Sequence, residues 1–372
     1  MENPFIVTGK IKPEYFCDRV EESKRLIRCV TNGGNLVLVS PRRLGKTGLI
    51  NYCFEDKSIK NLYDTIFIDI LSTTSLNELT FILGKAVFNT LKMRGAAMVK
   101  TLVSTLKSIS GSFGFDPVTG LPTFDVKLGD IAMPQYTLEE IFQCIEANDR
   151  RCIIAIDEFQ QIINYPEKNI EALLRTHIQH SSKASFIFAG SERHIMNELF
   201  LNSARPFYNS ADMLHLDPIE KEIYSNFVTY HFQKKNKVIS RQSISNVYDI
   251  FKGNTYYLQK TFREAYAITA EGKSCSDDEV KTIIQEMTTD NNHKYSEILS
   301  RLSLPQKELL FAIHHEGRAT QITSGKFIKK HNLQSTSSVQ SAMKKLIEYR
   351  LVTTEKNEYY IEDPLMNLWL ND

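Results

Sequence analysis

Short runs of consecutive apolar residues recur along the first part of the chain, with segments of helical spacing between them. The runs are LVLVS (36–40), TIFIDIL (65–71), CIIAID (152–157), SFIFAGS (185–191) and MLHL (213–216). Apolar runs of this length are typical of strands buried on both faces, and strands that alternate with helices indicate a parallel sheet. The pattern therefore predicts an α/β domain over residues 1–217.

One segment interrupts this alternation. Residues 91–135 are rich in Gly, Ser and Pro, and the turn sequence DPVTG lies between two short alternating runs. Such a pattern predicts a β-hairpin inserted into the domain at about residues 105–131. Two roles fit it: a surface hairpin without a catalytic part, or an arm that contacts a partner.

The pattern changes twice more toward the C-terminus. Residues 218–300 have helical spacing, and FKGNTYYLQ (251–259) separates two of the helices. Residues 301–372 contain three short helical patterns, within 304–317, 323–333 and 335–352, followed by two strands and a turn in VTTEKNEYYIEDP. Three helices followed by a β-hairpin indicate a winged helix-turn-helix domain.

Composition argues against a uniformly basic protein, a cysteine-based metal site, and a membrane-spanning or secreted protein. The chain has 372 residues, 42% of them apolar, and its 45 Lys and Arg nearly balance its 44 Asp and Glu, so a nucleic-acid site must be a local patch. The six cysteines show no metal-ligand spacing and are expected to be free thiols. No apolar run is long enough to span a bilayer and the start has no signal-peptide pattern, so we expect a cytoplasmic protein.

The clearest chemical signal is a phosphate-binding loop between the first strand and the next helix. SPRRLGKTGL (40–49) matches G-x-x-x-x-G-K-[ST] except that Ser40 stands in place of the first Gly. Lys46 is expected to contact the outer phosphates of ATP or ADP, and Thr47 to place its hydroxyl on Mg²⁺. The nucleotide-binding residues that this loop predicts are Ser40, Pro41, Arg42, Arg43, Leu44, Gly45, Lys46, Thr47 and Gly48.

A second motif supports the first. CIIAIDEFQ places Asp157 and Glu158 at the carboxyl end of a strand, where an open α/β sheet has its ligand crevice. Asp157 is expected to hold Mg²⁺ through water, and Glu158 to polarise the water that attacks the γ-phosphate. An acidic pair after a strand can also cap a helix, but its position after the phosphate loop favours the nucleotide site.

Two further residues are weaker candidates for the catalytic site. Ser191 ends the next strand, where it could orient the attacking water or the γ-phosphate. Arg205, in SARPFYNSA, could act as an arginine finger, although an Arg before Pro is more often an exposed loop residue.

Taken together, these motifs resemble the AAA+ type ATPases of the STAND group, in the archaeal-ATPase-like family. The segments that carry the resemblance are YFCDRVEESKRL (15–26), SPRRLGKT, IIAIDEFQ, FAGSERHIM, RPFYNSA, GNTYYL and the terminal winged helix. The resemblance implies a P-loop NTPase core with strand order 5-1-4-3-2, a helical lid over 218–300 and a winged helix over 301–372. It also implies that Phe16 and Arg19 lie near the adenine.

The chain departs from the family pattern at two places. Asn209 and Ser210 stand where the arginine motif usually has Gly-Arg, which bears on the role of Arg205. Thr255 stands where the lid motif has Pro.

The winged-helix segment carries a local charge. Residues 318–350 contain seven basic residues and one acid, Glu348, a net charge of 7 − 1 = +6, whereas the tail after them is acidic. A basic helix pair suits DNA phosphates, with Lys326, Lys329, Lys330, Lys344 and Lys345 as the contacts and residues 335–340 at the start of the reading helix. A charged face is also often only solvated, and winged helices also bind partner proteins.

The leading functional hypothesis is therefore an ATP-hydrolysing molecular switch with a winged-helix module for DNA or a partner protein. The alternative is a DNA-binding regulator that holds nucleotide and turns it over slowly. A small-molecule kinase is disfavoured, because an acid pair on a separate strand suits water activation.

Overall fold

The computed structural model describes residues 3–9, 11–112, 114–115, 122–124 and 126–371. The chain divides into two compact units. One is formed by residues 9–217, and the other combines residues 218–372 with the first eight residues. None of the described helices is long and apolar enough to cross a bilayer.

The first unit is built on a five-stranded parallel sheet. Its strands are β1 (Leu36–Val39), β2 (Tyr63–Asp69), β5 (Arg151–Asp157), β6 (Ala184–Gly190) and β7 (Asp212–His215), in the spatial order β2-β5-β6-β1-β7. Numbered along the chain, this is the order 5-1-4-3-2 that the family resemblance implied, so the predicted P-loop NTPase fold is confirmed.

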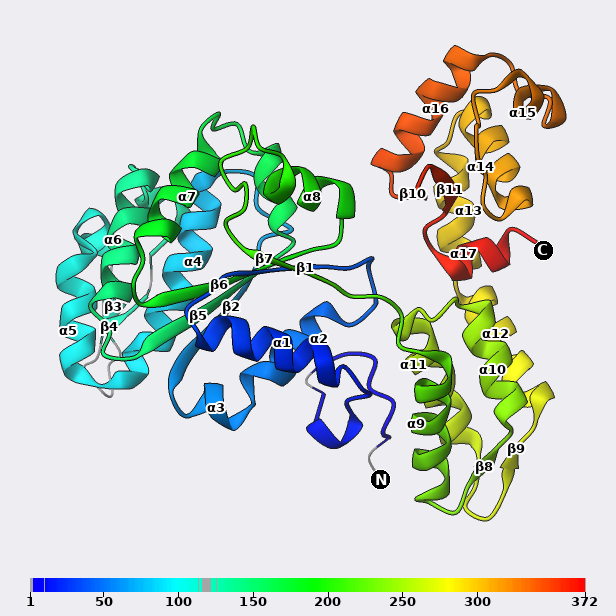
Figure 1. The fold of residues 1–372 in the computed structure, drawn as a ribbon, viewed down its shortest axis with the longest axis horizontal. Coiled ribbons are helices and arrows are strands. Elements are labelled where there is room, and N and C mark those ends of the chain that lie inside the picture. Colours follow the sequence, from blue (N-terminus) through cyan, green and yellow to red (C-terminus); the bar gives the residue numbers. More distant parts are fainter. Residues whose placement is uncertain (1–2, 10, 113, 116–121, 125, 372) are drawn as a thin grey trace. The chain divides into compact units, whose positions relative to one another are not determined.

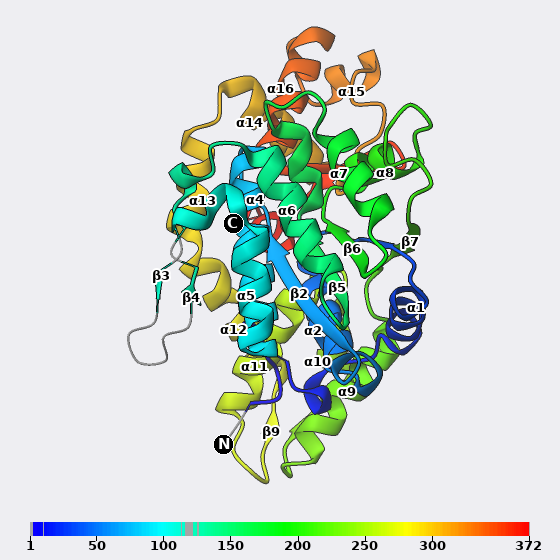
Figure 2. The ribbon, with the colours of Figure 1, turned by 90° about the vertical axis from the view of Figure 1, so that its left-hand side faces the viewer.

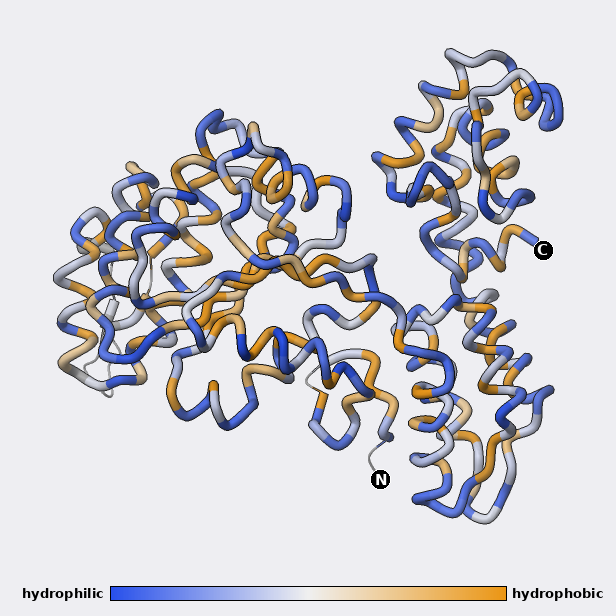
Figure 3. Tube along the Cα trace, in the orientation of Figure 1, coloured by the Kyte–Doolittle hydropathy of each residue, from blue (hydrophilic) through white to orange (hydrophobic). Residues whose placement is uncertain are grey.

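Helices cover both faces of the sheet (Figure 1), which explains the continuous apolar runs. One face packs on α1 (Val20–Thr31), α2 (Lys46–Phe54) and α3 (Lys57–Lys60). The other packs on α4 (Leu76–Leu91), α6 (Pro134–Glu146), α7 (Ile170–His180) and α8 (Arg193–Leu201). Figure 3 shows the apolar positions of this unit gathered along the strands and on the inner sides of the helices.

The expected insertion lies beyond α4. α5 (Ala96–Thr105) packs beside α4 and α6 (Figure 2), and the short strands β3 (Gly114–Phe115) and β4 (Pro122–Thr123) pair antiparallel in the segment where a hairpin is expected. The predicted DPVTG turn, residues 116–120, lies outside the described residues. The remaining short helices are 3₁₀ turns: η1 (Pro13–Tyr15), η2 (Lys92–Arg94), η3 (Lys107–Ser112), η4 (Leu128–Asp130) and η5 (Phe159–Asn164).

In the second unit, residues 218–300 form a helical subdomain. Its helices are α9 (Lys221–Gln233), α10 (Arg241–Ile250), α11 (Thr255–Ile268), α12 (Asp277–Asp290) and α13 (Asn292–Ser300). The sequence pattern did not predict the small parallel pair of β8 (Val238–Ile239) and β9 (Ser274–Cys275) in this region. Strands of two residues carry too little pattern to be recognised in sequence.

The C-terminal segment has the helices and strands of a winged helix. α14 (Leu304–Glu316), α15 (Gly325–Lys330) and α16 (Thr336–Glu348) precede the antiparallel strands β10 (Val352–Glu355) and β11 (Glu358–Ile361). A capping box between Ser303 and Gln306 starts α14. A last helix, α17 (Pro364–Trp369), was not predicted, and Asp363 caps it while also accepting a hydrogen bond from Tyr257 of α11 at 2.6 Å.

The N-terminal residues differ from the sequence expectation, which assigned them to the ATPase core. Phe5 is 1% exposed and its ring packs among aromatic side chains of α9 and α11, including Phe232 and Phe262. Asn3 donates to the carbonyl of Arg263 at 2.9 Å. A single Phe without periodic neighbours gave no signal of this docking, because it depends on a pocket formed by distant helices.

Burial of Phe5 leads to a stability prediction. Phe5→Ala removes a fully buried ring and should lower the free energy of unfolding of the second unit by about 3–5 kcal/mol. The chain has one tryptophan, Trp369, which lies in this unit, so urea unfolding followed by its fluorescence reports on that unit. Phe67→Ala, on β2 of the other unit, is the control and should leave the Trp369 transition in place. An unchanged transition in Phe5→Ala would contradict the docking of the N-terminus.

Candidate active site

The phosphate loop joins the carboxyl end of β1 to the start of α2, in the strand, loop and helix order that the motif requires. Gly45 has φ +90° and Arg43 has φ +67°, so the loop uses the left-handed region twice before the helix begins. Gly supplies this conformation at Gly45 without strain. Because the helix starts at Lys46, its first free N–H groups point toward the loop.

Ser40 replaces the first Gly of the motif without backbone strain. It is absent from the residues with positive φ, and its side chain is fully buried. Its N–H donates to the carbonyl of Gly190 at 3.2 Å, and its hydroxyl donates to the carbonyl of Pro41 at 2.9 Å. The first position of this loop therefore does not need the conformational freedom of glycine, and a small hydroxyl residue satisfies it.

Lys46 lies inside the site. Only 7% of the residue is exposed. Burial lowers the pKa of its ammonium group, and the nearby carboxylates of Glu158 and Asp157 act in the opposite direction. The sheet edge thus holds a desolvated positive charge beside two acids.

A hydrogen bond joins the two motifs. The hydroxyl of Thr47 donates to Oδ2 of Asp157 at 2.7 Å, and the N–H of Glu158 donates to Oδ1 of the same carboxylate at 2.9 Å. Asp157 is 5% exposed, and burial raises its pKa. The two expected metal ligands are therefore adjacent, and both offer oxygen atoms.

Glu158, the expected water-activating acid, accepts hydrogen bonds from two neighbouring side chains. Glu158 has φ +55°, a left-handed conformation that turns the chain sharply after β5. Its Oε2 accepts a hydrogen bond from the hydroxyl of Ser191 at 2.7 Å and another from the side-chain amide of Gln160. The structure thus brings Ser191 and Glu158 together at the carboxyl ends of β6 and β5.

Phe16 and Arg19, which precede α1, contact helix α2 and the phosphate loop. The ring of Phe16 stacks on Tyr52 of α2 with centroids 4.1 Å apart, and it also lies beside Gly48. Arg19 is 4% exposed and donates to the carbonyl of Asp217 at 2.6 Å. The structure therefore places both residues around the loop and the first helix, and their expected position near adenine remains a prediction.

Arg205 lies apart from the phosphate loop. Its guanidinium pairs with Glu171 of α7 at 2.8 Å and with Glu198 of α8. These contacts fix the loop after α8 to the helices that precede it. The structure does not bring Arg205 together with Lys46 and Glu158, so its role as an arginine finger remains a prediction.

Sequence reasoning missed two polar residues of the site. Gln160 is 2% exposed and lies in η5, directly beside Glu158 and Ser191. Glu192 follows β6, and burial raises the pKa of its carboxyl. The sequence did carry a signal for Gln160: it lies two residues after Glu158 and precedes the apolar pair Ile162 and Ile163, which indicates a turn that keeps it near Glu158.

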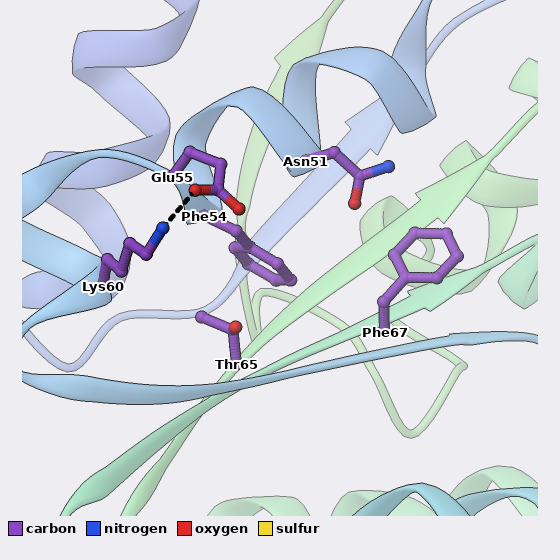
Figure 4. A pocket seen from close by; sticks show the side chains of 6 residues that line it. All are labelled: Asn51, Phe54, Glu55, Lys60, Thr65 and Phe67. Carbon is purple, nitrogen blue, oxygen red and sulfur yellow. Dashed lines mark hydrogen bonds and ion pairs between the residues drawn. The ribbon is translucent and has the colours of Figure 1, made fainter. Parts of the chain in front are cut away.

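A separate hollow of about 480 Å³ lies at the opposite end of α2 from the phosphate loop. Figure 4 shows its lining, which comes from the end of α2, the segment after it and the edge strand β2: Asn51, Phe54, Glu55, Lys60, Thr65 and Phe67. An ion pair of 2.6 Å between Lys60 and Glu55 closes one side. No residue expected in the nucleotide site lines this hollow.

Comparison with known families agrees with this arrangement. Residues 16–261 match the model of an ATPase domain found predominantly in Archaea. The chain belongs to this ATPase family. Residues 293–372 match the model of a probable winged helix domain. The resemblance to the archaeal ATPase family is thereby confirmed, and the chain is an ATPase that binds nucleotide.

Solved structures share the fold at low sequence identity. A Walker-type ATPase of Pyrococcus abyssi is 18% identical, with 99% of this chain and 100% of that chain covered and a TM-score of 0.70. The ORC2 protein of Aeropyrum pernix, as ADPNP–ADP complexes, is 13% identical over 99% and 96% of the chains, with a TM-score of 0.60. The ORC1 protein of the same organism in complex with DNA is 14% identical over 100% and 96%, with a TM-score of 0.56. No curated protein matches the chain.

Proposed function

We propose that the protein is an ATP-hydrolysing molecular switch whose winged helix contacts DNA phosphates. The observation that carries the enzymatic part is the hydrogen-bonded set at one edge of the sheet. Thr47 is bonded to Asp157, Glu158 is bonded to Ser191, and Lys46 is buried beside both acids. These are the groups that phosphate binding and water activation require.

Nucleotide binding rests on the phosphate loop. The N–H groups at the start of α2 and the helix dipole favour an anion, and Lys46 adds a full charge. Because Lys46 is desolvated, its attraction to a phosphate is stronger than it would be in water. Phe16 and Tyr52 form an apolar wall beside the start of the same helix, next to Gly48. The predicted contribution of Arg42 and Arg43 is positive charge at the loop.

The residues present fit a magnesium ion. The Thr47 hydroxyl and the Asp157 carboxylate lie 2.7 Å apart, and oxygen donors of these two kinds are those that Mg²⁺ takes beside phosphate groups. Asp157 would hold the ion through water and Thr47 through its hydroxyl. Bound there, the ion would neutralise charge on the phosphate oxygens.

Glu158 is the proposed general base. A carboxylate at this position accepts a proton from water as the water attacks the γ-phosphate. Ser191 fixes Oε2 of Glu158, and no described residue donates to Oε1. The second oxygen therefore remains available to accept a proton. Arg205, if it serves as a finger, would have to leave its pairs with Glu171 and Glu198.

The second part of the proposal concerns the winged helix. The buried side of α16 carries Val339, Ala342, Met343 and Leu346, which leaves Gln340 and Lys344 on the exposed side. Lys326 and Lys329 of α15 are also exposed. Basic side chains on the second and third helices suit phosphate contacts that flank a reading helix.

Ion pairs reduce the basic face that the sequence count predicted. Lys345 pairs with Glu348 at 2.8 Å, and Lys330 pairs with Glu316 at 2.6 Å. Arg318 pairs with Glu358 at 2.7 Å. The effective charge toward a DNA strand is therefore smaller than +6, and the strongest contacts are expected from Lys326, Lys329 and Lys344.

Lys46→Ala tests nucleotide binding. Loss of the ammonium group should abolish measurable ATP affinity in calorimetry, because the β and γ phosphates lose their main positive partner. The thermal midpoint should also fall, because the substitution leaves the buried Asp157 carboxylate without its positive partner. Lys24→Ala, an exposed lysine on α1, should bind ATP normally. Wild-type affinity in Lys46→Ala would contradict the loop assignment.

Glu158→Gln tests the chemistry. The amide cannot accept a proton, so hydrolysis should fall by roughly two orders of magnitude or more while ATP binding is kept. Asp157→Asn should instead weaken the difference in affinity between Mg²⁺ and EDTA buffers. Glu139→Gln, an exposed acid on α6, is the control. Equal turnover in Glu158→Gln and wild type would favour the slow-turnover regulator.

The double variant Lys344→Ala with Lys345→Ala tests DNA binding. It should weaken binding to all sequences and reduce the salt slope by about 1, because Lys344 no longer releases counterions and Lys345 is already paired with Glu348. Gel-shift titrations at two salt concentrations measure both effects, and ATP turnover without DNA should be unchanged. Lys273→Ala with Lys281→Ala, two exposed lysines of the helical subdomain, is the matched control. If wild-type protein shifts no DNA at low salt with ATP, ADP or neither, the winged helix binds a protein instead.

A further inference from the structure

Gln160 is a buried amide in the candidate site to which the motif gives no role. It is 2% exposed, and its Nε2 donates to Oε2 of Glu158 and lies 3.4 Å from the hydroxyl of Ser191. Most buried polar side chains have hydrogen-bond partners for their polar atoms. Its partners here are the proposed general base, the serine that holds the same base, and the carboxylate of Glu192.

The orientation of this amide follows from its neighbours. A carboxylate accepts hydrogen bonds and does not donate them, so the NH₂ group must face Glu158. The carbonyl oxygen Oε1 then points toward the end of β6, where it is buried without a partner among the described residues. An unpaired buried oxygen costs free energy, which the hydrogen bond from the amide to the Glu158 carboxylate must offset.

The backbone of β6 makes room for this side chain. A Cβ at Gly190 would lie 2.7 Å from Oε1 of Gln160 and 2.4 Å from the sulfur of Met196. Any residue larger than Gly at the end of β6 would therefore displace the amide or the helix behind it. Gln160 and Met196 together fill the space beside Gly190.

We propose that Gln160 is a positioning residue that fixes the Glu158 carboxylate for proton abstraction. With Gln160 and Ser191 both bonded to Oε2, the carboxylate can neither rotate nor turn back toward Lys46 without breaking two hydrogen bonds. Oε1 of Glu158 then keeps one orientation, toward the position from which water would attack the γ-phosphate. Small misplacements of a general base are costly in rate, which gives the amide a measurable effect.

This inference rests on the proposed function, since it needs Glu158 to be the base. Gln160→Met keeps the length and volume of the side chain and removes the donor. Its kcat should fall roughly 10- to 100-fold, whereas the KM for ATP should stay within about twofold, because the phosphate loop makes the binding contacts. Gln160→Asn keeps an amide but is one methylene too short to reach Glu158, and it should lose kcat in the same way.

The neighbouring residue provides a matched control. Gln161 lies in the same 3₁₀ turn and donates to the carbonyl of Thr73 at 2.9 Å, away from Glu158. Gln161→Met should lower the thermal midpoint as any lost hydrogen bond does, and leave kcat unchanged. A loss of kcat that follows only the loss of stability would appear in both variants and would overturn the proposal.

A double-variant cycle separates this inference from the proposed function. If Gln160 acts only through Glu158, then Glu158→Gln with Gln160→Met should be no slower than Glu158→Gln alone. Wild-type kcat in both folded Gln160 variants, with Glu158→Gln inactive, would overturn the positioning role and leave the proposed function standing. Full activity in Glu158→Gln would overturn both. Multiplicative losses in the double variant would show that Gln160 acts by another route.

Discussion

The hydrogen bond between Thr47 and Asp157 is the contact on which the rest of the site depends. Thr47 belongs to the helix after β1, and Asp157 ends β5, but β6 lies between these two strands in the sheet. The bond therefore spans a neighbouring strand and can form only if all three carboxyl ends lie at the same level. Parallel strands in the order β5-β6-β1 meet that condition, and Ser191, at the end of the middle strand, fills the gap.

This level edge has an electrostatic consequence. Burial raises the pKa of Asp157 and lowers that of Lys46, so both charged forms are costly there, and the attraction between Lys46 and the two acids offsets part of that cost. A site of this kind has already paid for desolvation before nucleotide arrives, and its dipoles need little reorganisation as charge develops on the phosphates. The same desolvation would make the orientation of Glu158, the proposed base, important, since bulk water cannot substitute for a misplaced carboxylate.

The sheet and the two nucleotide motifs were predictable because each is encoded locally. Continuous apolar runs mark β1, β5 and β6, and the loop residues 40–47 follow one run while Asp157 and Glu158 end another. The contacts missed from sequence are set by distant partners. The acids beside Lys46 lie more than a hundred residues away, and two of the seven basic winged-helix residues, Arg318 and Lys330, pair with acids outside the counted segment. Tertiary contacts of this sort leave no periodic pattern to read.

A switch also needs a physical link between its nucleotide site and its second unit, and the chain connects the units twice. One connection is at residues 217–218 and the other is at residues 8–9. At the second, Phe5 is fixed in the aromatic core of α9 and α11, while Ile11 lies beside Gly48 in the first turn of α2. At the first, Asp217 is held through its carbonyl by Arg19, whose guanidinium also lies 3.5 Å from the carbonyl of Leu44 in the phosphate loop. Both connections therefore start from groups in contact with the phosphate loop or its helix. In the proposed switch, a ligand that favours one arrangement of that loop would bear on both connections, which is the differential contact that a population shift between two states requires.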